Sequence, residues 1–415
     1  MKRIVFGLII LAIAVFAYSS PSAQVTSSKW WSIQSVDTMK YSRDPSREKL
    51  KDSSYDRVID QQVRQIAETG ATHVAIGTPY DEEFLSIMKR WVAAARRYGL
   101  NVWFRGNFSG WEKWFGYPAI TREEHKQKTE QFIRTHTDLF ADGDIFTPCP
   151  ECENGGPGDP RNNGDAAGHR AFLRELHEVA KRGFDAIGKN VESGFFSMNG
   201  DVARLIMDAE TTKALGGVVV IDHYVASPKQ LKEDIVALSK QSGGSIVLGE
   251  FGAPIPDIHG TMTQEAQAKW IGEALRAVSS VPEVIGFNYW TSVGGSTELW
   301  NGNGDARLAV QVLKLFFTPK IARGIVIDEL KNPIAQSIVS SEYRYTTTDQ
   351  SGKFVLPFLD ESVTVSVQAP GYDVKQVQAG NDNQEIAIPL VKQEESFWFK
   401  IQKFLHQLTT RGIIL

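Results

Sequence analysis

The sequence is short of cysteine, of net charge and of long apolar runs, and each shortage excludes a class of protein. Two cysteines, Cys149 and Cys152, are the only ones in 415 residues, and no HExxH motif occurs. A zinc site would need two further ligands at a recognisable spacing, so none is predicted. The formal net charge of −4 gives no reason to expect a nucleic-acid partner, because phosphate binding needs a concentrated basic surface.

One apolar run stands apart, at the N-terminus. Lys2 and Arg3 precede IVFGLIILAIAVFAY, and small and polar residues follow in SSPSAQ. This order is typical of a secretory signal peptide. An uncleaved membrane anchor is the alternative, although a span usually needs ~20 apolar residues. We therefore expect residues 1–23 to be a signal peptide or an anchor, and the protein to be extracellular or attached to the cell envelope.

The middle of the chain repeats one pattern eight times, in which a short β-rich run precedes an amphipathic stretch. Examples are THVAIGT before EEFLSIMKRWVAAARRYG, and GVVVIDHY before SPKQLKEDIVALSKQSG. The stretch 201–216 is expected to be one such helix. Eight strand–helix pairs predict a (β/α)₈ TIM barrel over residues 29–318. A doubly wound sheet is the alternative, but no glycine-rich phosphate loop follows the first strand.

After Phe317 the helical periodicity ends. Residues 321–392 contain short alternating runs separated by turns, which predicts a small all-β sandwich domain. The pattern GIVIDELKNPIAQSIVS…TTTDQSGKFVL…VSVQAPGY resembles the carboxypeptidase regulatory-like domain, a transthyretin-like sandwich. The resemblance implies an accessory module without peptidase chemistry. Residues 393–415 are expected to form an amphipathic tail that packs on the sandwich or contacts a membrane surface.

In a barrel, the polar groups that follow each strand meet at one rim, where catalytic residues lie. Two acids follow the predicted fourth and seventh strands, Glu151 and Glu250, and we predict that they are catalytic. We expect the other polar and aromatic residues of this rim to bind substrate: Arg105, Asn107, Trp111, Trp114, Glu153, His223, Tyr224, Trp290 and Trp300. Carboxylates among indole rings suit an oligo- or polysaccharide. No cofactor or metal is predicted.

The run VLGEFG (Val247 to Gly252) resembles the strand-7 motif of the clan-A, family-5-like retaining glycoside hydrolases. The resemblance spans most of residues 30–318. It implies that Glu250 is the nucleophile and that Glu151, in TPCPECE, is the acid/base. It also implies that Trp290 is an aromatic platform. Pro150 stands where that clan usually has an asparagine that contacts the sugar 2-hydroxyl.

Several alternatives stay open at this point. Glu153 has the same strand parity as Glu151 and competes for the acid role. The missing asparagine leaves room for a carbohydrate-binding barrel without catalysis. The cysteine pair leaves room for a redox or metal protein, although a redox CxxC normally begins a helix and Cys152 is followed by the loop-like ENGGPGDP. In an oxidising compartment the two cysteines are candidates for a local disulfide.

Overall fold

The computed structural model describes residues 23–24, 28–40, 42–380 and 385–393. The predicted N-terminal leader (1–23) and C-terminal tail (393–415) lie outside the described residues except for Ala23 and Gln393, so the expectations for them stay predictions. Among the described residues, no helix is long and apolar enough to cross a membrane.

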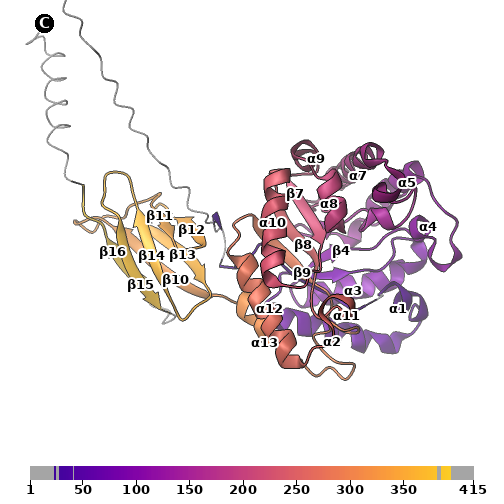
Figure 1. Cartoon of the computed structure of the whole chain (residues 1–415), viewed down its shortest axis with the longest axis horizontal. Helices are drawn as coiled ribbons and strands as arrows, with labels where there is room; N and C mark the ends of the chain where they lie inside the picture. Colours follow the sequence, from indigo (N-terminus) through magenta and orange to yellow (C-terminus); the bar gives the residue numbers. More distant parts are fainter. Residues whose placement is uncertain (1–22, 25–27, 41, 381–384, 394–415) are drawn as a thin grey trace, which may run out of the picture.

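Eight parallel strands form one curled sheet in the order β5-β4-β3-β2-β9-β8-β7-β6, with helices around it (Figure 1). This confirms the predicted (β/α)₈ barrel. The strands are β2 (Ile33–Asp37), β3 (His73–Ile76), β4 (Asn101–Phe104), β5 (Ile145–Phe146), β6 (Ser197–Asn199), β7 (Val218–Asp222), β8 (Ser245–Phe251) and β9 (Val284–Tyr289). Two backbone hydrogen bonds, both 2.8 Å long, link the two ends of this sheet order. Phe146 of β5 donates to Glu192, which precedes β6, and Glu151, which follows β5, donates to Ser197 of β6.

The helices that follow the strands carry apolar residues on the face toward the sheet. The long ones are α2 (Asp56–Glu68), α3 (Leu85–Arg97), α5 (Arg122–Thr135), α7 (Ala166–Ile187), α10 (Pro228–Ser242), α12 (Gln264–Ser279) and α13 (Leu308–Phe317). Shorter helices and turns lie mostly in the connections: α1 (Arg43–Glu48), η1 (Ser53–Tyr55), η2 (Glu82–Phe84), α4 (Ser109–Glu112), η3 (Trp114–Gly116), η4 (Thr137–Leu139), η5 (Cys152–Asn154), α6 (Pro160–Asn163) and α11 (Pro256–His259).

The helix expected over 201–216 is wrong as a single element. The structure has α8 (Gly200–Ile206) and α9 (Ala209–Ala214) instead. The Asp208 side chain accepts a hydrogen bond from the Thr211 backbone N–H and so begins a new helix in the middle of the predicted one.

The barrel interior has an apolar plug beneath a charged layer. Inward-facing residues from successive strands form the plug: Ile33, Ala75, Trp103, Ile145, Phe195, Val220 and Val247. Strand side chains alternate between faces, so residues two or four positions further along the same strands point inward above the plug. These include Asp37 above Ile33, Arg105 above Trp103 and Asp222 above Val220. The polar groups are thus gathered at the mouth, the rim formed by the carboxyl ends of the barrel strands.

Two sheets form the predicted β-sandwich beyond the barrel. One has the order β1-β12-β11-β14-β15 and the other β13-β10-β16, and an apolar cluster that includes Val326, Leu356 and Val365 lies between them. Their strands are β1 (Ala23–Gln24), β10 (Lys320–Ile327), β11 (Ile338–Ser340), β12 (Arg344–Thr347), β13 (Lys353–Phe358), β14 (Ser362–Gln368), β15 (Lys375–Gly380) and β16 (Glu385–Pro389). The two-residue β1 pairs in parallel with β12, so a segment before the barrel joins the sandwich.

The sandwich packs on the barrel at the end opposite the mouth. The buried Arg344 guanidinium lies 4.4 Å from the centre of the Trp30 ring and donates a hydrogen bond to the Trp30 carbonyl. Trp30 precedes β2, so it lies at the amino-terminal end of the strands. Leu359 joins the apolar cluster of the barrel, and Arg276 at the end of α12 pairs with Asp360 at 2.9 Å.

Candidate active site

Arg105 is the centre of the charged layer at the mouth. Its Nη1 lies 3.2 Å from Asp37 Oδ2, and its Nη2 lies 3.3 Å from both Asp222 Oδ2 and Glu250 Oε1. The Arg105 side chain is 4% exposed. One guanidinium therefore bridges three carboxyl groups from β2, β7 and β8, and the five N–H donors of arginine make such sharing possible.

The glycine of the VLGEFG run explains how Glu250 reaches this layer. The register between β7 and β8 shifts here: Ile221 is opposite Leu248, whereas Asp222 is opposite Glu250. Gly249 is the extra residue, as in a β-bulge. A Cβ on Gly249 would lie 2.4 Å from Asp222 Oδ1, so no larger residue fits. The bulge turns the Glu250 side chain toward Arg105.

Glu250 has a second partner on β7's loop. The Tyr224 hydroxyl donates a 2.9 Å hydrogen bond to Glu250 Oε2, while Arg105 contacts Oε1. The Trp290 ring lies edge-on to the Tyr224 ring, with 6.3 Å between centroids. The structure thus brings together four of the predicted residues, Arg105, Tyr224, Glu250 and Trp290. The Glu250 side chain is 20% exposed, more than Asp37 at 9% or Asp222 at 2%, so it is the carboxyl of this group that a ligand can reach.

Burial controls protonation in this layer. It raises the pKa of Asp37 to about 6, although the Arg105 charge opposes the rise. Burial also raises the pKa of Asp222 well above its ordinary value, and the negative charge of Glu250 adds to the rise. For Arg105, burial favours the neutral form, but Asp222, Glu250 and Asp37 together outweigh it and raise the pKa. The arginine stays charged, and burial makes both Asp37 and Asp222 weaker acids than an exposed aspartate.

Glu151 follows β5 and lies within electrostatic reach of Glu250. Burial, followed by the charges of Glu250 and Glu153, raises the pKa of Glu151 to about 8. The Glu151 carboxyl therefore keeps its proton at neutral pH. Retaining glycosidases hold their two carboxyl groups ~5–5.5 Å apart, and this separation stays a prediction for Glu151 and Glu250.

Glu153 is less suited to the acid role. It is 2% exposed, and its Oε1 accepts hydrogen bonds from the backbone N–H and the Nδ2 of Asn199, at 2.8 and 2.9 Å. These bonds hold the carboxyl against β6. Glu151 is half-buried and is therefore the better placed of the two to meet a ligand.

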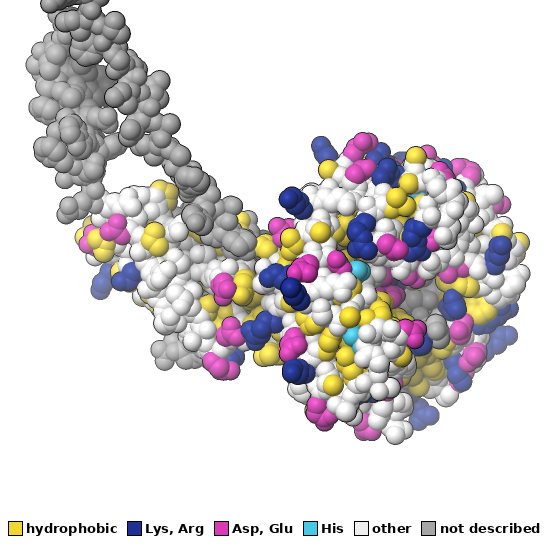
Figure 2. Space-filling model, in the orientation of Figure 1, with side chains coloured by type: hydrophobic (Ala, Val, Ile, Leu, Met, Phe, Trp, Pro, Cys, Tyr) yellow, Lys and Arg dark blue, Asp and Glu magenta, His cyan; other side chains and the backbone are white. Residues whose placement is uncertain are grey.

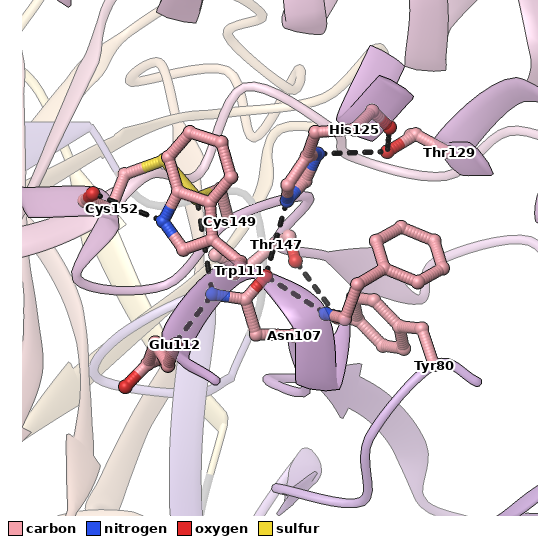
Figure 3. The surroundings of a disulfide bond; sticks show 10 residues. Tyr80, Asn107, Trp111, Glu112, His125, Thr129, Thr147, Cys149 and Cys152 are labelled. Atoms are coloured by element: carbon pink, nitrogen blue, oxygen red, sulfur yellow. Dashed lines mark hydrogen bonds between the residues drawn. A yellow bond between two sulfur atoms is a disulfide. The ribbon is translucent and has the colours of Figure 1, made fainter. Parts of the chain in front are cut away.

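Asn107 and Trp111, two expected sugar contacts, are supports beneath the rim (Figure 3). Asn107 is fully buried; its Nδ2 donates to Glu112 at 3.2 Å, and its Oδ1 lies 3.1 Å from His125 Nε2. Trp111 belongs to α4, not to an irregular loop, is 1% exposed and stacks on Phe172 with 5.2 Å between centroids. We withdraw both from the substrate-binding set.

Three further predicted contacts are Trp300, Trp114 and His223. Trp300 is 3% exposed and belongs to the barrel's apolar cluster, so it too is withdrawn. Trp114 is half-buried on the rim, where the Arg43 guanidinium lies 4.7 Å from its ring centre. His223 pairs with Asp234 at 2.8 Å, so it orients no carboxyl of the mouth through that ring nitrogen.

Sequence reasoning missed several residues of the site. Asp37 and Asp222 were not proposed, yet both contact Arg105. Asn288 on β9 donates to Asp37 Oδ2 at 3.4 Å and to the Gly249 carbonyl at 3.1 Å, and so ties the bulge to the charged layer. The available signal was strand parity: each residue is the inward-facing polar residue at or near the end of an apolar strand.

Cys149 and Cys152 form a disulfide. Both are buried, at 0% and 3% exposed. Cys152 begins η5, a single turn of three residues. The pair therefore occupies a connection beside the mouth, with Glu151 between its two members.

No family model matches the chain, and no curated protein matches it in sequence. Among solved structures, the chain is similar to GH5_18 from Bifidobacterium longum subsp. longum, with 18% identity and a TM-score of 0.52 over 72% of this chain and 85% of that one. It is also similar to GH5_18 from Streptomyces cattleya in complex with GlcNAc, with 15% identity and a TM-score of 0.54 over 73% and 85%. A Streptomyces cattleya variant bound to Manb1-4GlcNAc matches at 14% identity, with a TM-score of 0.54 over 71% and 85%. This likeness shows the fold.

Proposed function

We propose that this protein is a retaining glycoside hydrolase that cleaves O-glycosidic bonds of an oligo- or polysaccharide. One observation carries the proposal: two carboxyl groups at the mouth have environments that divide the work of acid and nucleophile. Glu151 keeps its proton near neutrality, because its pKa is raised to about 8. Glu250 accepts hydrogen bonds from a permanent cation, Arg105, and from a phenol, Tyr224, and both donors stabilise an anion there.

The proposed reaction has two steps. Glu151 donates its proton to the glycosidic oxygen while a Glu250 oxygen attacks the anomeric carbon, so the leaving alcohol departs and a covalent glycosyl-enzyme forms. Glu151 then removes a proton from water, which attacks the anomeric carbon and releases Glu250. Two displacements at one carbon retain its configuration.

The electrostatics of the mouth assist the change of role between the steps. The Glu250 charge is the second largest cause of the raised pKa of Glu151, after burial. Formation of the ester removes that charge. The pKa of Glu151 therefore falls in the intermediate, when the group has to act as a base.

The substrate is proposed from the lining of the mouth and from the structural neighbours. Trp290 lies beside Tyr224 and offers an apolar face for a pyranose ring. The GH5_18 structures include complexes with Manb1-4GlcNAc and with GlcNAc. A β-linked mannosyl or N-acetylglucosaminyl oligosaccharide is therefore the first substrate to test.

The sandwich is proposed to be a carboxypeptidase regulatory-like accessory domain that attaches or spaces the barrel. Its position at the end opposite the mouth supports a role outside catalysis, since Arg344 and Asp360 contact the barrel far from Glu250's strand end. Export from the cytoplasm is supported by the disulfide, because oxidising compartments preserve such bonds.

Pro150 favours one second candidate, a carbohydrate-binding barrel without catalysis, because a proline lacks the amide that contacts the sugar 2-hydroxyl in the clan. A panel of aryl glycosides and oligosaccharides tests both. Turnover with retention of anomeric configuration, measured by proton NMR, supports the hydrolase. Saturable binding of an oligosaccharide without hydrolysis of it or of any aryl glycoside supports the second candidate, and inversion contradicts the proposed mechanism.

A further inference from the structure

The Glu151 carboxyl is placed by its backbone alone. Among the described residues, no hydrogen bond or ion pair holds that carboxyl, whereas the Glu250 carboxyl is held by Arg105 and Tyr224. A proton donor must lie within hydrogen-bond reach of the group that it protonates. Whether the Glu151 carboxyl lies within reach of a leaving group therefore depends on the backbone conformation of the connection after β5.

That conformation is one that a glutamate rarely adopts. Glu151 has φ 42° and ψ 52°, in the left-handed region, where the Cβ of an L-residue crowds the backbone. Its backbone N–H donates to the Ser197 carbonyl at 2.8 Å, and its carbonyl accepts from Asn154 at 2.8 Å. The disulfide joins Cys149 and Cys152, which are the residues on either side of Pro150–Glu151. The crosslink therefore restrains the segment in which the strained residue lies.

The Trp111 side chain lies against the segment that carries the disulfide (Figure 3). Its indole Nε1 donates to the Cys152 carbonyl at 3.2 Å, and its own carbonyl accepts from Gly156 at 2.8 Å. A Cβ on Gly156 would lie 2.3 Å from the indole ring, so the connection passes directly over it. Residues 149–156 are thereby fixed at one end by the disulfide and at the other by the indole.

We propose that the Cys149–Cys152 disulfide, seated on Trp111, is a positioning device that holds Glu151 where it can transfer a proton to the leaving group. The inference rests on the proposed hydrolase function and deepens it, because it makes acid catalysis depend on the oxidised pair. A dithiol reductant, oxidised in turn to its own disulfide, would convert the bond to two thiols and release the segment.

Two substrates with different leaving groups separate a loss of Glu151 positioning from a general loss of activity. We compare C149A/C152A with wild type on the 2,4-dinitrophenyl and phenyl glycosides of a sugar that the wild type cleaves. The first leaving group departs without a proton, and the second needs one. Acid help is worth ~10²–10⁴-fold, so we expect kcat/KM to fall at least about 10-fold on the phenyl glycoside and less than about 3-fold on the dinitrophenyl glycoside. W111F, which removes the indole N–H and the part of the ring beside Gly156 but leaves the disulfide, should shift the same ratio by less.

Ile133→Ala is the matched control. Ile133 is a buried residue of α5 whose side chain faces Gly183 of α7, so its loss should lower both rates by the same factor or neither. Equal losses on both glycosides in C149A/C152A, or no loss, would overturn the positioning proposal. A wild type that cleaves no aryl glycoside or oligosaccharide of the panel would instead contradict the hydrolase function itself, and with it the acid role of Glu151.

A second measurement does not depend on turnover. Hydrogen–deuterium exchange of residues 145–156 is followed in the full protein before and after treatment with dithiothreitol, with thiol titration to confirm reduction. We expect faster exchange at the Glu151 and Asn154 amides after reduction, and no change on α5. Unchanged exchange in the reduced protein would show that the disulfide does not hold the segment.

Discussion

Arg105 Nη2 lies 3.3 Å from Glu250 Oε1 and 3.3 Å from Asp222 Oδ2. The same guanidinium thus holds the proposed nucleophile and a buried acid on the neighbouring strand. On the face of the molecule in view, side chains of both charge signs are interspersed (Figure 2), whereas three carboxyl groups surround one arginine at the mouth.

Replacement of Arg105 by methionine should remove activity and destabilise the fold. Three buried or half-buried carboxyl groups would lose their shared cation, and breaking a buried ion pair costs about 3–5 kcal/mol. Urea denaturation measures the loss. Arg64→Met is the control, because its contact with Glu68 is exposed and 3.9 Å long, and such pairs contribute ~0–1 kcal/mol. Equal denaturation midpoints for the two variants would contradict the central role of Arg105.

The rate of hydrolysis should fall on the alkaline side as Glu151 loses its proton. Its pKa is about 8 in the free protein, so kcat/KM on a phenyl glycoside should decline as the pH rises through about 8. The rate on a dinitrophenyl glycoside should show no such decline at that pH, since its leaving group needs no acid. Profiles of kcat/KM from pH 5 to 10 on the two substrates provide the check, and parallel alkaline limbs would exclude Glu151 as the acid.

The stability of the fold should also depend on the Glu151 proton. Its pKa rises on folding from an ordinary 4.5 to about 8, so the folded state binds the proton more tightly. Between these values the unfolded chain releases a proton that the folded chain keeps, and stability therefore falls as the pH rises. In urea denaturation from pH 5 to 8, E151Q should show a shallower fall than wild type. E233Q, which changes an exposed residue of α10, should follow the wild type.

Removal of residues 321–415 should leave turnover of a small glycoside within about 2-fold but lower the melting temperature. The sandwich contacts the barrel at Trp30, opposite the mouth, and its loss exposes apolar surface there. R276A is the control, because it removes only the ion pair with Asp360. A large loss of kcat in the truncated protein, with circular dichroism showing it folded, would mean that the sandwich supports the active site.

The barrel was predictable because its sequence pattern is periodic over eight repeats, and the strand ends place Arg105 and Glu250 near one rim. Strand parity predicts the inward direction of Arg105, but Glu250 faces inward only through the register shift at Gly249. The depth of a residue below that rim is not periodic. Asn107, Trp111 and Trp300 follow strands just as Tyr224 and Trp290 do, yet they are buried. Their burial depends on the helices that cover them, which come from distant parts of the chain.

Two other features have no local signature. Position 249, where the register shifts, has to be glycine because Asp222 on the neighbouring strand occupies the space that a side chain would need. The pairing of Ala23–Gln24 with β12 involves two residues separated from their partners by most of the chain. Such contacts are decided by tertiary packing and not by the propensity of the segment.

The most direct measurement compares E250Q and E151A on a dinitrophenyl glycoside with and without azide. E250Q keeps the shape of the side chain but cannot form the covalent intermediate, so it should be nearly inactive. E151A should still form that intermediate, and azide should accelerate its breakdown and give a glycosyl azide of the substrate's anomeric configuration. Normal turnover in E250Q would contradict the account. If C149S were inactive at the same time, the result would point to chemistry at the cysteine pair instead.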